Sequence, residues 1–95
     1  MLVKNRIKSK ALRRLAFDGD ESGINPNWLE RVKLILNALD VAVSPYELDL
    51  PGMRLHELKG KRAGTFSVRV TGNYRITFGW SDAGPRDVDL EDYNG

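Results

Sequence analysis

The chain has 95 residues, of which 41% are apolar and 29% charged, with no cysteine and a single histidine. This length fits one domain, residues 1–95, and the composition is typical of a folded chain. The absence of cysteine excludes a disulfide framework and a thiolate metal site, and one histidine does not build a zinc site. We therefore predict no metal and no cofactor.

No run in the sequence approaches the roughly 20 apolar residues of a membrane span. The first ten residues, MLVKNRIKSK, lack the apolar region of a signal peptide. We therefore expect a cytoplasmic protein with no membrane partner.

The net charge of +2 conceals two basic segments. Residues 1–14 carry a charge of +6 and residues 54–75 a charge of +5, so the rest of the chain carries −9. Segments this basic can bind a polyanion locally. For residues 1–14, the alternative is that the lysines are ordinary solvated charges.

In chain order, residues 2–7 alternate weakly and predict a first strand at a sheet edge. Ser9 can cap a short helix that runs to about Phe17 and ends at the Asp-Gly-Asp of residues 18–20. We expect the inner side of this helix to hold Leu12, Leu15 and Ala16.

A longer helix is predicted from Pro26 to about Val41, because Asn25 is a good N-cap and proline suits the first turn. Its apolar stripe follows spacings of three and four residues. The stripe consists of Leu29, Val32, Leu36 and Leu39, with Trp28 and Ile35 beside it. The Ser-Pro-Tyr-Glu of residues 44–47 fits a capping box before one more helical turn.

Two strands follow, over residues 65–71 and 73–80, joined by a turn in which Gly72 can supply a positive φ. Apolar residues fall at 66, 68 and 70 and then at 74, 76, 78 and 80. Because side chains alternate between faces, the opposite face should display Ser67, Arg69, Asn73 and Arg75. A last strand over residues 87–93 should turn Val88 and Leu90 inward.

Helices first and antiparallel strands after predict a small α+β domain. Two N-terminal helices would cover one face of a curved, mainly antiparallel sheet. The other face would be open to solvent and basic. Arginines and an asparagine on that face, near a His-x-x-Lys at residues 56–59, suit a phosphodiester backbone.

Four patterns in the C-terminal half occur together with a short first helix and a Pro-x-Trp start of the long helix. They are Gly52-x-Arg54-Leu55-His56-x-Leu58-Lys59-Gly60, Ser67-Val68-Arg69-Val70, Gly72-Asn73-Tyr74-Arg75-Ile76 and Glu91-Asp92-Tyr93. In this combination the chain resembles the HigB-type toxins of the RelE/ParE superfamily over nearly its whole length.

The resemblance implies a RelE-like microbial ribonuclease fold and the toxin of a type II toxin–antitoxin system. Such toxins are ribosome-dependent endoribonucleases that cleave mRNA in the decoding site. We expect a metal-independent endoribonuclease, because the basic segment has no cluster of acids and histidine with the spacing of metal ligands. The implied partners are the ribosome with its mRNA and a HigA-like helix-turn-helix antitoxin, with operator DNA reached only through the antitoxin complex. The implied catalytic residues are His56, Lys59, Arg69, Arg75 and Tyr93, and the implied RNA-binding residues are Arg54, Asn73, Asp92 and Asn94.

The side chains fit that chemistry, although each has a simpler alternative. Arg69 and Arg75 can neutralise phosphate charge, and the imidazole of His56 is the one clear candidate for proton transfer. Lys59 could supply charge or act as a base, and Tyr93 could stack on a nucleobase or transfer a proton. Alternatively, Arg54, Arg69 and Arg75 pair with acids of the last strand, and we expect at least one such pair. The acids concerned are Asp87, Asp89, Glu91 and Asp92.

The family pattern ends in Asp-Tyr-His, whereas this chain has Asn94. Asparagine does not exchange a proton near neutral pH as imidazole does. Either this lineage functions without that histidine, or the chain is a weakened toxin retained for antitoxin binding and operon autoregulation. A further alternative is a ParE-like toxin that inhibits DNA gyrase.

Overall fold

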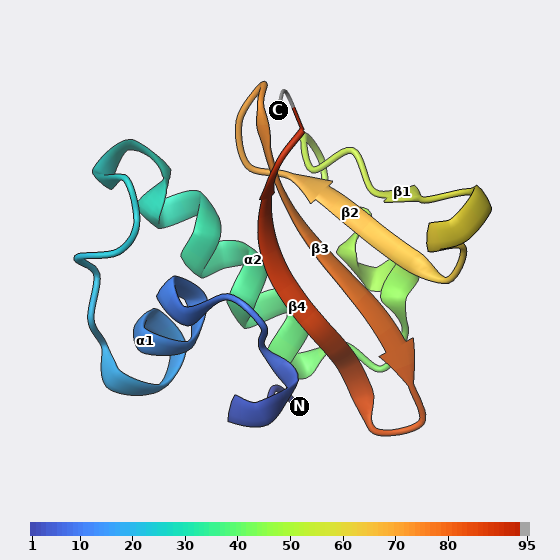
Figure 1. Ribbon diagram of the computed structural model, residues 1–95, viewed down its shortest axis with the longest axis horizontal. Helices are drawn as coiled ribbons and strands as arrows, with labels where there is room; N and C mark the ends of the chain where they lie inside the picture. The colour runs from blue at the N-terminus through green and yellow to red at the C-terminus, as the bar shows by residue number, and fades with distance from the viewer. Residues whose placement is uncertain (94–95) are drawn as a thin grey trace.

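A computed structural model describes residues 1–93, and it shows two helices on one side of a four-stranded antiparallel sheet (Figure 1). The helices are α1 (Lys10–Asp18) and α2 (Leu29–Val41). The strands are β1 (His56–Glu57), β2 (Thr65–Arg69), β3 (Tyr74–Ser81) and β4 (Gly84–Asp92), in the spatial order β1-β2-β3-β4. The predicted α+β class is confirmed.

The predicted beginnings and ends of the two helices are also confirmed. The Ser9 hydroxyl accepts a hydrogen bond from the Leu12 amide at 3.2 Å, and Gly19 ends α1 in the left-handed conformation. Asn25 caps a 3-10 turn, Pro26–Trp28, that continues into α2. At the capping box, the Ser44 hydroxyl accepts from the Tyr46 amide.

The first segment was predicted wrongly as a strand. It forms a 3-10 turn, Lys4–Arg6, and only Ile7 bridges to β4, in parallel with Val88. Leu2 and Ile7 are both buried, and the turn between them brings both into the core. A compact turn is therefore favoured over an extended strand in this segment, because it buries two apolar side chains.

Three smaller differences concern single positions. Ala16 is exposed and not on the inner side of α1. The β2–β3 turn does not use a positive φ at Gly72; instead the Thr71 hydroxyl accepts from the Asn73 and Tyr74 amides. The two-residue strand β1 was not predicted, because two residues are too short to show an alternation.

The core lies between α2 and the inner face of the sheet. Val32, Ile35 and Leu39 of α2 are fully buried, as are Ile76 and Phe78 of β3. This apolar layer fixes which face of each strand is left for polar side chains.

A β-bulge in β4 determines which of its side chains reach the outer face. Thr77 pairs with Asp89, but Gly79 pairs with Arg86, so β4 has one extra residue in this interval. Asp87 absorbs it with a φ of +51°. Without the bulge, regular alternation would put Asp89 and Glu91 on the side of Pro85, which is buried.

The core assignment can be tested with two leucines of α2. Leu39 has no exposed surface, whereas Leu34 on the same helix is 52% exposed. Leu39→Ala should lower the free energy of unfolding by about 2–5 kcal/mol, because it leaves a cavity. Leu34→Ala, the matched control, should change it by less than about 0.5 kcal/mol. Urea unfolding measures both, and equal effects would contradict the packing described.

Candidate functional site

Cross-strand register assembles the outer face of the sheet. One row runs from His56 through Ser67 and Thr77 to Asp89. The next row contains Arg69, Arg75 and Glu91. Residues directly opposite each other project from the same face with Cβ atoms about 5 Å apart. The predicted face is thus confirmed for Ser67, Arg69 and Arg75.

Arg75 lies between a hydroxyl and an aromatic ring. Its Nη1 donates to the Ser67 Oγ at 3.3 Å, and its guanidinium carbon is 5.4 Å from the centroid of the Tyr93 ring. The Tyr93 amide in turn donates to the Asn73 carbonyl at 2.7 Å. Asn73, Arg75 and Tyr93 are therefore held together at one end of the sheet.

The loop before β1 brings a further arginine to the same end. The Met53 carbonyl accepts from the Arg69 amide at 2.7 Å, so Arg54 follows directly on a residue bound to β2. Arg54 has a φ of +51°, a left-handed conformation that is uncommon outside glycine. Arg31 of α2 fixes this junction, because it donates to both the Arg69 and Gly52 carbonyls.

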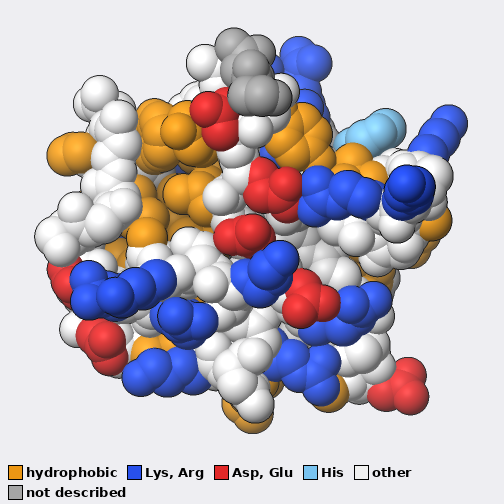
Figure 2. Space-filling view, in the orientation of Figure 1, with side chains coloured by type: hydrophobic (Ala, Val, Ile, Leu, Met, Phe, Trp, Pro, Cys, Tyr) orange, Lys and Arg blue, Asp and Glu red, His pale blue; other side chains and the backbone are white. Residues whose placement is uncertain are grey.

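His56 and Lys59 are exposed on the outer side of this region. Figure 2 shows the single histidine protruding at the margin of the molecule. Its link to the arginines is Ser67, which faces His56 in the register and accepts from Arg75. Asp92 is exposed opposite Tyr74, and Asn94 lies outside the described residues.

The outer face is not uniformly basic, contrary to our expectation. Strand β4 adds acids to it, and red and blue side chains lie next to one another over the strands in Figure 2. Arg62 binds Glu91 with two hydrogen bonds, of 2.9 and 2.6 Å, and Arg86 pairs with Asp87 at 2.8 Å. Glu91 and Asp87 thus pair with Arg62 and Arg86, and not with the arginines that we had considered.

Glu91 is the centre of a small polar network. Its carboxylate also accepts from the hydroxyl of Thr77, which is buried, as is Ser67. The hydrogen bond from Arg62 is the main reason that the pKa of Glu91 lies below its ordinary value; burial opposes the shift, and Thr77 adds to it. The same contact raises the pKa of Arg62.

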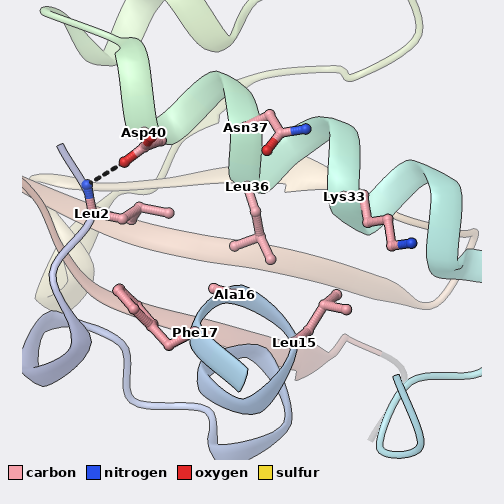
Figure 3. Close-up of a pocket in the computed structure, with 8 residues that line it drawn as sticks. All are labelled: Leu2, Leu15, Ala16, Phe17, Lys33, Leu36, Asn37 and Asp40. Atoms are coloured by element: carbon pink, nitrogen blue, oxygen red, sulfur yellow. Dashed lines mark hydrogen bonds between the residues drawn. The ribbon is translucent and has the colours of Figure 1, made fainter. Parts of the chain in front are cut away.

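Among the hollows on the surface of residues 1–93, two lie beside the elements discussed here. One, of about 190 Å³, lies beside the Glu91 network and is lined by residues that include Lys8, Arg62 and Arg86. The larger, of about 320 Å³, lies in the helix layer between α1, α2 and the N-terminal segment (Figure 3). It is lined by leucines and Phe17, with Lys33, Asn37 and Asp40 along α2, and the Leu2 amide donates to Asp40 at 2.9 Å.

Within residues 1–93, no three acidic or histidine side chains are grouped as they would be to hold a metal ion. In the same part of the chain, no helix has the length and apolarity needed to cross a bilayer.

Sequence patterns did not identify Arg62 or Arg31 as parts of this region. They placed Ser67 on this face but gave no role to its hydroxyl. Arg62 contacts a residue 29 positions away, and Arg31 contacts one 38 positions away. The available signal for Arg31 was a charged residue next to the apolar stripe of α2. Nothing in the local sequence distinguishes Arg62 from Lys61.

Arginines on a sheet face of a small α+β domain are compatible with binding to nucleic acid, and comparison with known proteins shows the family. The family model described as RelE-like toxin of type II toxin-antitoxin system HigB matches residues 5–93. The chain therefore belongs to the family of HigB-like toxins. Endoribonuclease HigB from Proteus vulgaris is 36% identical over 87 residues, which cover 92% of this chain and 95% of that protein. The predicted family is confirmed.

The Glu91 network makes a prediction about acid stability. Because the pKa of Glu91 is lower in the folded chain than its ordinary 4.5, the unfolded chain binds more protons in acid. The stabilisation is complete above about pH 5 and is lost as the pH falls through the folded-state pKa. Glu91→Gln should therefore be less stable than the unsubstituted chain at pH 7, with a difference that narrows towards pH 3.

Urea unfolding from about pH 3 to 7 measures that difference. The matched control is Glu21→Gln, which neutralises a half-exposed carboxylate paired with Lys33 and should change the stability at pH 7 by less than Glu91→Gln does. A difference between the unsubstituted and Glu91→Gln chains that stays constant with pH would contradict the network.

Proposed function

We propose that this chain is the ribosome-dependent endoribonuclease of a type II toxin–antitoxin system and that it cleaves mRNA in the decoding site, in the cytoplasm. The observation that carries the proposal is the pairing of Arg69 with Arg75 directly across two strands. Like charges in that position destabilise a sheet. Their repulsion is relieved when a phosphate binds between them, because guanidinium groups pair bidentately with phosphate oxygens.

Cleavage in this proposal needs no metal at the toxin. The 2′-oxygen of the ribose attacks the adjacent phosphorus, the bond from phosphorus to the 5′-oxygen breaks, and a 2′,3′-cyclic phosphate remains. The 2′ proton leaves to a base, and a proton is delivered to the departing 5′-oxygen. Arg69 and Arg75 stabilise the extra negative charge on the phosphorane-like transition state.

Proton transfer falls to the side chains near the two arginines. His56 is the main group, because histidine is the side chain that most often transfers protons in enzymes and its strand faces Ser67, the partner of Arg75. Lys59 supplies positive charge from the loop after β1. Tyr93, already in contact with Arg75, stacks on a nucleobase or exchanges a proton.

RNA on either side of the cut would follow the same end of the sheet. Arg54 and Asn73 flank the two arginines there, and Asp92 would extend the contact at the end of β4. Asn94 is included as an RNA-binding residue on the resemblance alone. The left-handed backbone at Arg54 supports its assignment, because strained residues are often retained where a binding role requires them.

The family implies an antitoxin, and we propose that it is a HigA-like helix-turn-helix protein. The toxin would reach operator DNA only as part of that complex. Cleavage of RNA is favoured over inhibition of gyrase by the relative from Proteus vulgaris, which is named an endoribonuclease.

Position 94 supports a second candidate, a toxin weakened by asparagine where the family pattern has histidine. Such a chain would still bind antitoxin and take part in operon autoregulation. Single-turnover cleavage of ribosome-bound mRNA by the Asn94 and Asn94→His chains, compared between about pH 5.5 and 8, separates the two candidates. A large gain for histidine would indicate attenuation, and equal rates would place residue 94 outside the catalytic site.

Arg75→Ala should lower cleavage by about a hundredfold or more, because it removes one preorganised charge contact to the transition state. Its melting temperature should be unchanged or higher, since the repulsion from Arg69 is relieved. Arg86→Ala is the matched control, because Arg86 lies on the same face but is paired with Asp87. It should keep cleavage near the original rate. Full activity of Arg75→Ala, or inactivity caused by unfolding, would contradict the assigned role.

A further inference from the structure

Arg75 has a carboxylate within reach that it does not bind. Glu91 stands directly opposite Arg75 in the β3–β4 register, as Arg69 does in the β2–β3 register. Opposite charges at such a distance ordinarily form an ion pair. On register alone, Glu91 is therefore the expected partner of Arg75.

The Glu91 carboxylate is bound by Arg62 instead. Arg62 belongs to the 3-10 turn Gly60–Arg62 between β1 and β2, and it holds both carboxylate oxygens of Glu91. Thr77 donates to one of the same oxygens, Oε2. With only 24% of its side chain exposed, Glu91 is confined beneath Arg62. The described partners of Arg75 are a neutral hydroxyl and an aromatic ring.

We propose that Arg62 is a positioning residue that draws Glu91 away from Arg75 and so keeps the Arg75 guanidinium available for an RNA phosphate. The inference rests on the proposed function, in which Arg75 binds the scissile phosphate. An arginine that already makes two hydrogen bonds to a carboxylate has neither its charge nor its paired N–H groups available for a second anion. Arg62 acts on the reaction only through Glu91.

The hydrogen-bond geometry explains why removal of Arg62 should redirect Glu91. Thr77 binds Oε2 alone, so the loss of Arg62 leaves Oε1 without a donor. Arg75 is directly opposite in the register and carries donors in a planar fork. Pairing with Arg75 would give Oε1 a hydrogen-bond donor, and it would also neutralise the charge of the Arg75 guanidinium.

A purely structural role for Arg62, tying the turn to the sheet, makes a different prediction. In that case, removal of Glu91 as well would leave the turn equally detached, and the double substitution would be as impaired as the single one. If Arg62 protects Arg75 from Glu91, neutralising Glu91 should restore what the loss of Arg62 removes. The double substitution therefore distinguishes the two roles.

The test is single-turnover cleavage of ribosome-bound mRNA by the full chain and a set of variants. Arg62→Met should be slower by about tenfold or more, approaching the loss of one transition-state donor. Glu91→Gln should stay near the original rate. Arg62→Met/Glu91→Gln should recover to about the rate of Glu91→Gln. Arg62→Lys, which keeps a cation beside Glu91, should lose less than Arg62→Met.

A crystal structure of Arg62→Met adds a readout that does not depend on activity, because Glu91 should be found at salt-bridge distance from Arg75. A double variant that stays as slow as Arg62→Met while folded, or a Glu91 that stays on Thr77 alone, would overturn the inference. Arg75→Ala is assayed in parallel. If it cleaves normally, the proposed function fails; if it is inactive while the double variant does not recover, only the inference about Arg62 fails.

Discussion

The structure depends most on the register of β3 between its two neighbours. That register sets Arg75 between Arg69 on one side and Glu91 on the other. Burial of Ile76 and Phe78 against the helices fixes the register, because a slip of one residue would turn the arginines into the core. The apolar layer is therefore what holds a repulsive pair of cations on the outer face.

A bulge in β4 and the turn before β2 then decide how much of that charge is neutralised. The bulge at Asp87 turns Glu91 to the arginine side of the sheet, and the turn before β2 supplies Arg62 to bind it. The acidic side chains of β4 thus lie on the polar face without neutralising the charge of Arg75. Proteins often keep such locally unfavourable charge arrangements at functional sites, where a ligand relieves them.

Much of this could be predicted from sequence, because it depends on local rules. Alternation placed Ser67, Arg69 and Arg75 on one face, and the caps at Ser9 and Asn25 gave the helix starts. What could not be predicted depends on distant contacts or on very short segments. The pairing of Arg62 with Glu91 spans 29 residues, β1 has two residues, and the supposed first strand, residues 2–7, folds as a turn. The roles assigned to the site residues combine three arguments, which are the strand register, the resemblance to the toxin family and the chemistry of RNA cleavage.

The most direct test of the central claim, that this sheet face cuts mRNA by attack of the 2′-oxygen, is the chemistry of the product ends. Purified protein would be added to a translating extract with a defined mRNA, and the termini at the cut would be identified. The account predicts a 2′,3′-cyclic phosphate on the upstream fragment and a 5′-hydroxyl on the downstream one. A 3′-hydroxyl with a 5′-phosphate, or intact mRNA together with inhibited gyrase supercoiling, would contradict it.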